Sequence, residues 1–208
     1  MRRRDSPGSF PGSAFAAGSA ADACDLVLLR RVAAGDRRAF RALYERFYHQ
    51  ILRFIYRITR RFDVAEEGVN DVMLVVWRDA SSFRGQSRVS TWIMGIAYRK
   101  ALKSAEQSRR RHERFPLTDP TYLGDTAPDE AAHPETHDLR DWLAAALEQL
   151  SGEHRAVVEL TYYHGYSYAE IARIVDCPVN TVKTRMFYAR EKLGRLLPPL
   201  AGAEVRDR

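Results

Sequence analysis

The stretch SYAEIARIVDCPVNTVKTRMFYAREKL, residues 167–193, decides the fold of the carboxy-terminal part of the chain. It opens with Ser167 and Glu170 at capping-box spacing, where the hydroxyl accepts from the third helical N–H and the carboxylate reaches back to the cap N–H. A short helix follows, then a turn over residues 176–178, then a long helix expected over 179–197. A short capped helix, a tight turn and a longer helix together predict a helix-turn-helix.

The long helix divides into an inner and an outer face when its residues are placed at steps of about 100°. The inner face is apolar and consists of Val182, Met186, Ala189 and Leu193. The outer face carries polar groups and two aromatic rings between basic edges: Asn180, Thr181, Thr184, Phe187 and Tyr188, with Lys183 and Arg185 on the flanks. Solvent gives no reason to expose two rings, whereas side chains in a major groove reach base edges and thymine methyls. We therefore favour DNA binding over an ordinary helical hairpin with a solvated face.

Residues 113–137 differ in composition from the rest of the chain. Prolines at positions 116, 120, 128 and 134 exclude a regular helix, and nothing alternates like a strand. We interpret this segment as a flexible interdomain linker. An apolar helical stripe resumes after it, so the second domain is expected over 138–197, with a tail over 198–208.

Amphipathic helices are also predicted before the linker. Apolar residues recur at helical spacing from Phe40 to Ile58, after a break and candidate N-cap at Gly35-Asp36. A second helix is expected over 64–80, and a third from about residue 90 to the basic run at 109–111.

These helices place the first domain at 25–112, after a disordered tail over 1–24 that is rich in Gly, Ser and Ala. No segment predicts a sheet. The expected fold class is therefore all-α: two small helical domains joined by a flexible linker, the carboxy-terminal one a helix-turn-helix.

The composition favours an anionic partner. The 208 residues carry a net charge of +6, and a basic balance suits nucleic acid or a membrane surface. No segment approaches a membrane span or a secretion signal, and two distant cysteines build neither a disulfide framework nor a zinc site. We expect a cytoplasmic protein without membrane insertion, cofactor or metal; His133 and His137 have ligand-like spacing but lack neighbouring cysteines.

Residues 81–111 interleave aromatic and basic side chains. Cations meet phosphates, and aromatic faces stack on unpaired bases, so the segment suits a protein that captures one strand of opened DNA. The candidate residues are Phe83, Arg88, Trp92, Tyr98, Arg99 and Lys103. The alternative, in which Trp92 belongs to the core and the charges form a solvated helix face, is equally compatible with the composition.

The predicted helix over 64–80 begins acidic and carries more apolar surface than one stripe requires. Such a helix is a candidate protein-docking face. A middle helix that is wholly buried in a bundle is the alternative, and the sequence leaves the two open.

Three stretches in this order resemble the extracytoplasmic-function (ECF) group of bacterial RNA polymerase sigma factors. Residues 65–77, AEEGVNDVMLVVW, resemble its acidic helix that docks on the clamp of the polymerase β′ subunit. Residues 89–99, VSTWIMGIAYR, resemble its helix that recognises and melts the minus-ten promoter element, and residues 167–193 resemble its minus-thirty-five reader. The resemblance spans roughly residues 25–197.

The resemblance implies roles for individual residues. Asn70, Asp71 and Trp77 would belong to polymerase docking, Trp92 and Arg99 to minus-ten capture, and Lys183, Thr184, Phe187 and Tyr188 to minus-thirty-five reading. It implies core RNA polymerase (its β′ clamp and β subunit), promoter DNA and an anti-sigma protein as partners, and no catalysis by the chain itself.

The sequence departs from the family pattern at three places. Gly68 stands where a bulky apolar residue is usual, Asn70-Asp71 where Gln-Glu is usual, and Arg99 where Asn is frequent. The first two bear on docking and the third on the identity of the captured base.

Two other functions compete with this interpretation. A free-standing helix-turn-helix regulator would bind duplex DNA without polymerase, but it leaves the strand-capture composition without a use. An enzyme is disfavoured, because the sequence has no Gly-rich phosphate loop, nucleophile elbow or metalloprotease helix.

Overall fold

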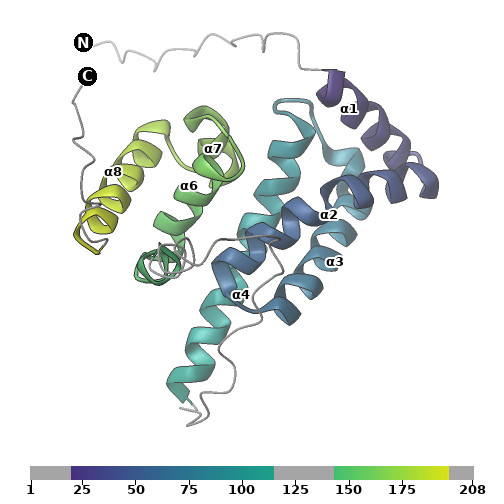
Figure 1. The fold of residues 1–208 in the computed structure, drawn as a ribbon. Helices are drawn as coiled ribbons and strands as arrows, with labels where there is room; N and C mark the ends of the chain where they lie inside the picture. Colours follow the sequence, from purple (N-terminus) through teal and green to yellow (C-terminus); the bar gives the residue numbers. More distant parts are fainter. Residues whose placement is uncertain (1–19, 115–142, 197–208) are drawn as a thin grey trace, which may run out of the picture.

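The structure is a computed structural model that describes residues 20–114 and 143–196 (Figure 1). Within these ranges every regular element is a helix, which confirms the all-α class. The predicted linker, 113–137, lies outside the described residues except for 113–114, which continue a helix, and the tail over 198–208 lies outside them too.

The amino-terminal group of helices comprises α1 (Ala20–Ala33), α2 (Arg37–Thr59), α3 (Phe62–Asp79), the 3-10 turn η1 (Ala80–Ser82) and α4 (Val89–Arg114). Helix α1 begins inside the 1–24 segment that the sequence assigned to a disordered tail. Its Asp25, Leu29 and Val32 are buried, and this packing fixes the helix against the rest of the group.

The start of α2 shows how local chemistry sets these boundaries. Gly35 takes a positive φ of 86°, which suits a residue without Cβ, and Asp36 is the predicted N-cap. Its carboxylate accepts from the N–H groups of Arg38 at 2.8 Å and Ala39 at 3.1 Å. These backbone hydrogen bonds, with that from the Arg31 side chain, lower the pKa of Asp36.

The carboxy-terminal group comprises a helical segment over 143–148, α6 (Gly152–Tyr162), α7 (Tyr168–Ile174) and α8 (Val179–Leu196). Both reciprocal bonds of the predicted capping box are present between Ser167 and Glu170. The turn after α7 places Asp176 at a φ of 52°, and α8 follows at once. The helix-turn-helix prediction is confirmed, and Val182, Met186 and Ala189 form its buried inner face.

The two groups of helices pack directly against each other. Helix α7 lies along α4 and α6 meets α2, a contact that we call the domain seam. The approach is close: a Cβ added to Gly95 of α4 would lie 3.6 Å from the carbonyl oxygen of Ile174 in α7. The sequence predicted two tethered domains but gave no indication that they touch.

Arg155 of α6 joins the two groups at the centre of the seam. The residue is only 8% exposed, and its guanidinium donates to carbonyl oxygens on both sides. On its own side it reaches Leu147 at 2.8 Å and Glu148 at 2.8 Å, and across the seam it reaches Ile58 at the end of α2 at 3.2 Å. The side chain therefore satisfies carbonyls that the last turn of α2 leaves without a helical partner.

Candidate functional site

The outer face of α8 is arranged as the sequence predicts. Phe187 is 64% exposed and Tyr188 is 54% exposed, and their ring centroids lie 5.5 Å apart in an edge contact. Asn180, Lys183 and Thr184 are exposed beside them, whereas Thr181 is half-buried. This face offers donors, a cation and two rings to a partner, and no side chain of the described residues covers the rings.

Arg185 differs from its neighbours on α8. Its side chain is only 19% exposed and forms an ion pair with Glu153 of α6 at 2.7 Å. Its charge also acts on Tyr98 of α4 across the domain seam. In this arrangement Arg185 is therefore engaged inside the molecule and does not lie free on the outer face.

The candidate residues over 83–103 differ in exposure. Phe83 and Trp92 are half-buried with ring centroids 5.5 Å apart, and both pack against the core. Arg99 and Lys103 are exposed on α4. Trp92 therefore contributes to the core and is still partly exposed. The use of this segment for strand capture stays a prediction.

Tyr98 and Arg88 are engaged by the domain seam. Tyr98 is 6% exposed, and burial raises the pKa of its hydroxyl. Arg88 forms ion pairs at 3.2 Å with Asp22 of α1 and at 3.2 Å with Glu170 of α7. While the seam is closed, Tyr98 is buried, whereas Arg88 is held in two ion pairs with its side chain still 48% exposed.

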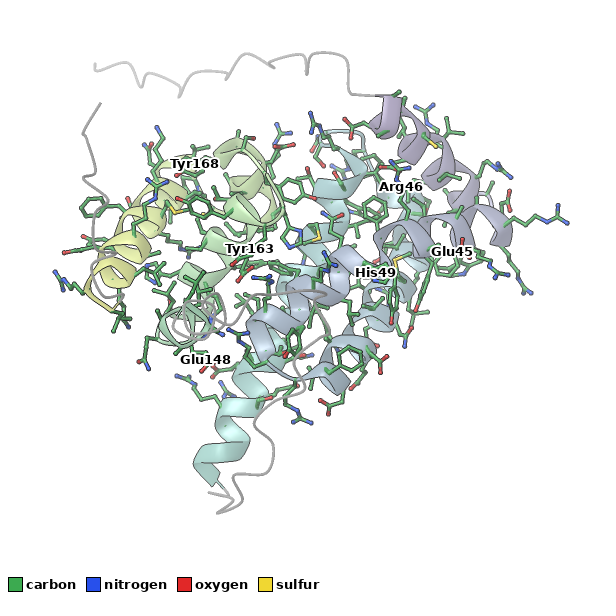
Figure 2. All side chains as sticks on the ribbon, viewed as in Figure 1. Glu45, Arg46, His49, Glu148, Tyr163 and Tyr168 are labelled. Carbon is green, nitrogen blue, oxygen red and sulfur yellow. The ribbon has the colours of Figure 1, made fainter. Side chains whose placement is uncertain are left out.

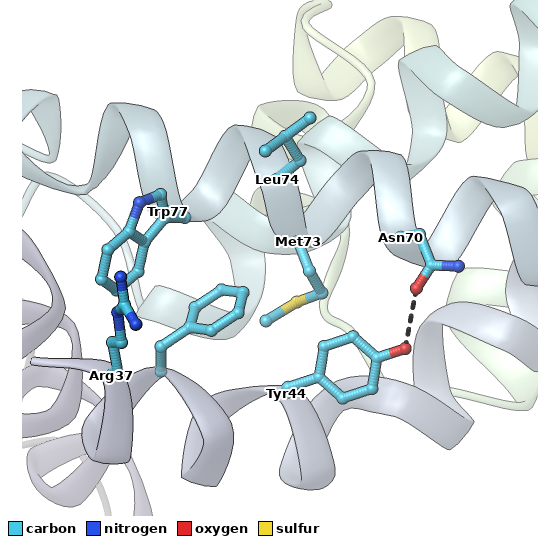
Figure 3. Close-up of a pocket in the computed structure, with 7 residues that line it drawn as sticks. Arg37, Tyr44, Asn70, Met73, Leu74 and Trp77 are labelled. Atoms are coloured by element: carbon cyan, nitrogen blue, oxygen red, sulfur yellow. Dashed lines mark hydrogen bonds between the residues drawn. The ribbon is translucent and has the colours of Figure 1, made fainter.

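A groove of about 490 Å³ runs between α2 and α3 (Figure 3). Its walls are mostly apolar: Arg37, Phe40 and Tyr44 from α2, and Asn70, Met73, Leu74 and Trp77 from α3. Phe40 meets Trp77 edge-on at 5.1 Å, and Leu74 is 62% exposed at the rim. An exposed apolar surface of this kind is a candidate site of interaction with another protein.

Two polar contacts hold the groove in shape. The Tyr44 hydroxyl donates to Oδ1 of Asn70 at 2.9 Å, the bond drawn in Figure 3. Asp71 forms an ion pair with Lys100 of α4, so its carboxylate faces the neighbouring helix. Of the predicted docking residues, Asn70 and Trp77 line the groove, and Asp71 lies beside it.

Gly68, one of the departures from the family pattern, lies away from the groove. It is buried, and a Cβ at this position would come within 2.8 Å of Cδ1 of Ile55 in α2. The missing side chain therefore acts on the packing of α3 against α2 and not on the surface of the groove.

Sequence reasoning missed Phe40 and Tyr44 as groove residues, because their helical spacing assigned them to the core stripe. It also missed Arg155 and its buried neighbour Glu159, since no local signal marks a polar pair at an interface between domains.

The described residues contain no cluster of three or more His, Cys, Asp or Glu that could hold a metal ion, and His133 and His137 lie outside the described residues. Among the helices over 20–114 and 143–196, none is long and apolar enough to cross a membrane.

Comparison with known proteins places both groups of helices in one family. The family model Sigma-70 region 2 matches residues 43–111, and the model Sigma-70, region 4 matches residues 140–193. The RNA polymerase sigma-H factor of Pseudomonas aeruginosa is 34% identical over 187 residues, which cover 85% of this chain and 95% of the relative. The ECF RNA polymerase sigma-E factor of Escherichia coli strain K12 is 33% identical over 186 residues, with coverage of 85% and 95%.

Solved structures share the fold of this chain. CnrH in complex with the cytosolic domain of CnrY shares the fold, with a TM-score of 0.60 at 22% identity over 83% of this chain and 96% of that one. The sigma factor RpoE from Bartonella quintana, solved with the anti-sigma factor NepR, has a TM-score of 0.55 at 27% identity over 76% of this chain and 95% of that one. The chain belongs to the ECF group of RNA polymerase sigma factors.

Proposed function

We propose that this sigma factor binds core RNA polymerase through the α2–α3 groove and reads promoter DNA with two separate faces. The α4 face, with the loop before it, would take the minus-ten element, and the outer face of α8 the minus-thirty-five element. As a sigma factor, the chain directs promoter-specific initiation. We infer that polymerase performs the chemistry and that the chain contributes none.

The exposed ring pair on α8 carries the DNA-reading part of this proposal. Phe187 and Tyr188 are more than half exposed on the second helix of a helix-turn-helix, which is the helix that enters a major groove in this motif. Lys183 is exposed beside them and suits a phosphate contact.

The groove supports the docking part of the proposal. Leu74 and Trp77 project from α3 beside Phe40, which provides an apolar surface that an isolated sigma factor leaves uncovered. Burying such a surface against a partner supplies most of the favourable free energy of association.

Minus-ten capture requires the two groups of helices to separate. Arg99 and Lys103 are exposed in this arrangement, but Tyr98 and Arg88 are held in the domain seam. Interfaces between domains are commonly polar and allow relative motion. We therefore infer that the closed arrangement opens when polymerase and both promoter elements are bound.

An anti-sigma protein is a further inferred partner. RpoE from Bartonella quintana was solved with the anti-sigma factor NepR, and CnrH was solved with the cytosolic domain of CnrY. A protein that covers the groove or stabilises the seam would keep this sigma factor from polymerase, and we infer that this takes place in the cytoplasm.

Run-off transcription with purified core polymerase tests the proposal. We expect initiation only when the protein is present, from fragments of a promoter library that share two spaced elements. Lys183→Ala should lower promoter affinity and reduce the salt dependence of binding by about one released counterion. Tight binding to duplex DNA without initiation would instead support a free-standing regulator.

A further inference from the structure

A second cavity, of about 400 Å³ and open to solvent, lies at the domain seam and has strongly basic walls. One wall is α2 and the other is the end of α6 with the residues after it. The lining side chains are Arg46, His49, Gln50, Arg53 and Arg57 from α2, with Tyr163 and His164 opposite. Figure 2 labels Arg46 and His49 on α2 and Tyr163 on the facing group of helices.

Acidic residues balance only part of this charge. Arg46 forms an ion pair with the buried Asp25 at 2.6 Å, and Arg57 lies 3.4 Å from the buried Glu159. Arg53 and His49, in contrast, have neither an ion pair nor a hydrogen bond to any side chain within residues 20–114 and 143–196. The cavity is therefore left with an unbalanced guanidinium beside an imidazole.

His164 adds an unpaired nitrogen to the same cavity. Its Nε2 is buried without a hydrogen-bond partner in the described part of the chain, while its ring packs against Phe54 at 5.8 Å. Burial, followed by the charges of Arg57 and Arg53, lowers the pKa of His164 to about 4. A buried polar atom without a hydrogen-bond partner destabilises the folded chain. In the tautomer that carries the proton on Nε2, a ligand oxygen could accept a hydrogen bond from this N–H and remove that destabilisation.

We propose that this seam cavity is a binding site for a small phosphate-bearing anion, held by Arg53 and His49 from α2 and by His164 from the carboxy-terminal group. A guanidinium matches two phosphate oxygens at once, and both imidazoles can donate to the others. The volume lies within the range of small-molecule sites.

Such a ligand contacts both groups of helices, so its binding stabilises the closed arrangement by mass action. Binding of the anion does not depend on promoter recognition. An effect of the anion on initiation rests on the proposed function, in which the two groups of helices separate.

Calorimetry on the full chain in phosphate-free buffer tests the site, with inorganic pyrophosphate and ADP as probes and malonate as a dianion without phosphorus. We expect the phosphate probes to bind at least about ten-fold more tightly than malonate. Arg53→Gln and His164→Phe should each weaken pyrophosphate binding about ten-fold or more. Arg41→Gln is the matched control on the same helix, because Arg41 pairs with the exposed Glu45 at 2.9 Å outside the cavity.

Three outcomes would overturn the site. Absence of binding at about 10 mM pyrophosphate would exclude it. Equal affinity for malonate would exclude phosphate recognition, and an equal loss in Arg41→Gln would indicate diffuse attraction by the basic surface.

Bridging of the two groups needs a separate measurement. Dyes on Cys24 of α1 and on a cysteine introduced by Glu191→Cys in α8, in a Cys177→Ser background, report the distance between the groups. Pyrophosphate should increase the high-transfer population, and Arg53→Gln should remove that increase. If pyrophosphate binds but the high-transfer population does not change, the bridging role is refuted. Normal promoter-specific initiation by Arg53→Gln would show that the proposed function does not depend on this site.

Discussion

The α2–α3 groove and the domain seam both use α2 as a wall, but they differ in chemistry. The groove is built from rings and a projecting leucine, with the Tyr44–Asn70 hydrogen bond at one end. The seam contains a buried arginine on backbone carbonyls and several ion pairs, among them Arg57–Glu159 and Arg88–Glu170. Apolar surfaces stay attractive once they are joined, whereas polar groups exchange a neighbour for water at small net cost. This difference supports the proposal that a stable partner covers the groove and that the seam is the contact that opens.

The strongest test of the seam is Arg155→Ala. This change removes the guanidinium that donates to the carbonyls of Leu147, Glu148 and Ile58, and the bonds to Leu147 and Ile58 are buried. We expect a loss of about 3 kcal/mol in the free energy of unfolding, measured by urea denaturation. Arg190→Ala, which removes an exposed arginine bound to the Tyr162 hydroxyl at 2.6 Å, is the control and should cost less than about 1 kcal/mol. Equal losses would mean that Arg155 has no special part in the seam.

The groove is tested by Leu74→Asp. Leu74 is 62% exposed, so the fold should tolerate the carboxylate, while an apolar partner surface should not. We expect affinity for core polymerase to fall about 10- to 100-fold, measured by competition against another sigma factor. Val27→Asp alters a 55% exposed residue of α1 outside the groove and should leave the affinity unchanged. An equal fall in both variants would point to a general charge effect.

The seam should also respond to acid through His164. Its pKa is about 4 in the folded chain and 6.5 when unperturbed, so between these values the unfolded chain binds more protons. The stability from burying the neutral ring is complete above pH 6.5 and is lost as the pH falls toward 4. By pH 5 the loss should reach about 2 kcal/mol. Urea denaturation in phosphate-free buffer above pH 6.5 and at pH 5 measures this loss of stability. The variant His164→Phe cannot titrate at this position and should lose less stability between the two pH values. An identical loss in the variant would refute the assignment of the pH dependence to His164.

The smallest effect is expected from Arg88→Gln. Its ion pairs to Asp22 and Glu170 are near the surface, with the arginine side chain 48% exposed. Pairs of this kind contribute less than about 1 kcal/mol. Urea denaturation should therefore show little change, while the dye pair on the two groups should show a slightly larger open population. A destabilisation as large as that of Arg155→Ala would contradict the view that the outer seam is weakly held.

Local signals allowed much of this structure to be predicted from the sequence. Asp36 and the Ser167–Glu170 box set helix starts through contacts within a few residues, and both caps are formed. The outer face of α8 followed from helical periodicity, because Val182, Met186 and Ala189 must be inside together. Such features depend only on neighbours along the chain.

The seam could not be predicted in this way. Tyr98 and Arg88 have the composition of a strand-capture surface, yet both are held by residues more than eighty positions away along the chain. The same holds for Gly68, where the sequence suggested a change in docking and the structure has a contact with Ile55. Side chains with the same sequence spacing can contact either a binding partner or another helix of the same chain. Tertiary contacts decide between the two, and helical periodicity contains no information about them.

The contact between Gly68 and Ile55 carries a consequence for how sequences of this family can change. Because a Cβ at 68 would meet Cδ1 of Ile55 at 2.8 Å in a closed core, the two positions share one volume. Relatives with a larger residue at the first position should carry a shorter one at the second, so that the two positions covary. The paired change Gly68→Ala with Ile55→Val should then have a larger free energy of unfolding than Gly68→Ala alone. Neither change alters the residues of α3 that line the groove.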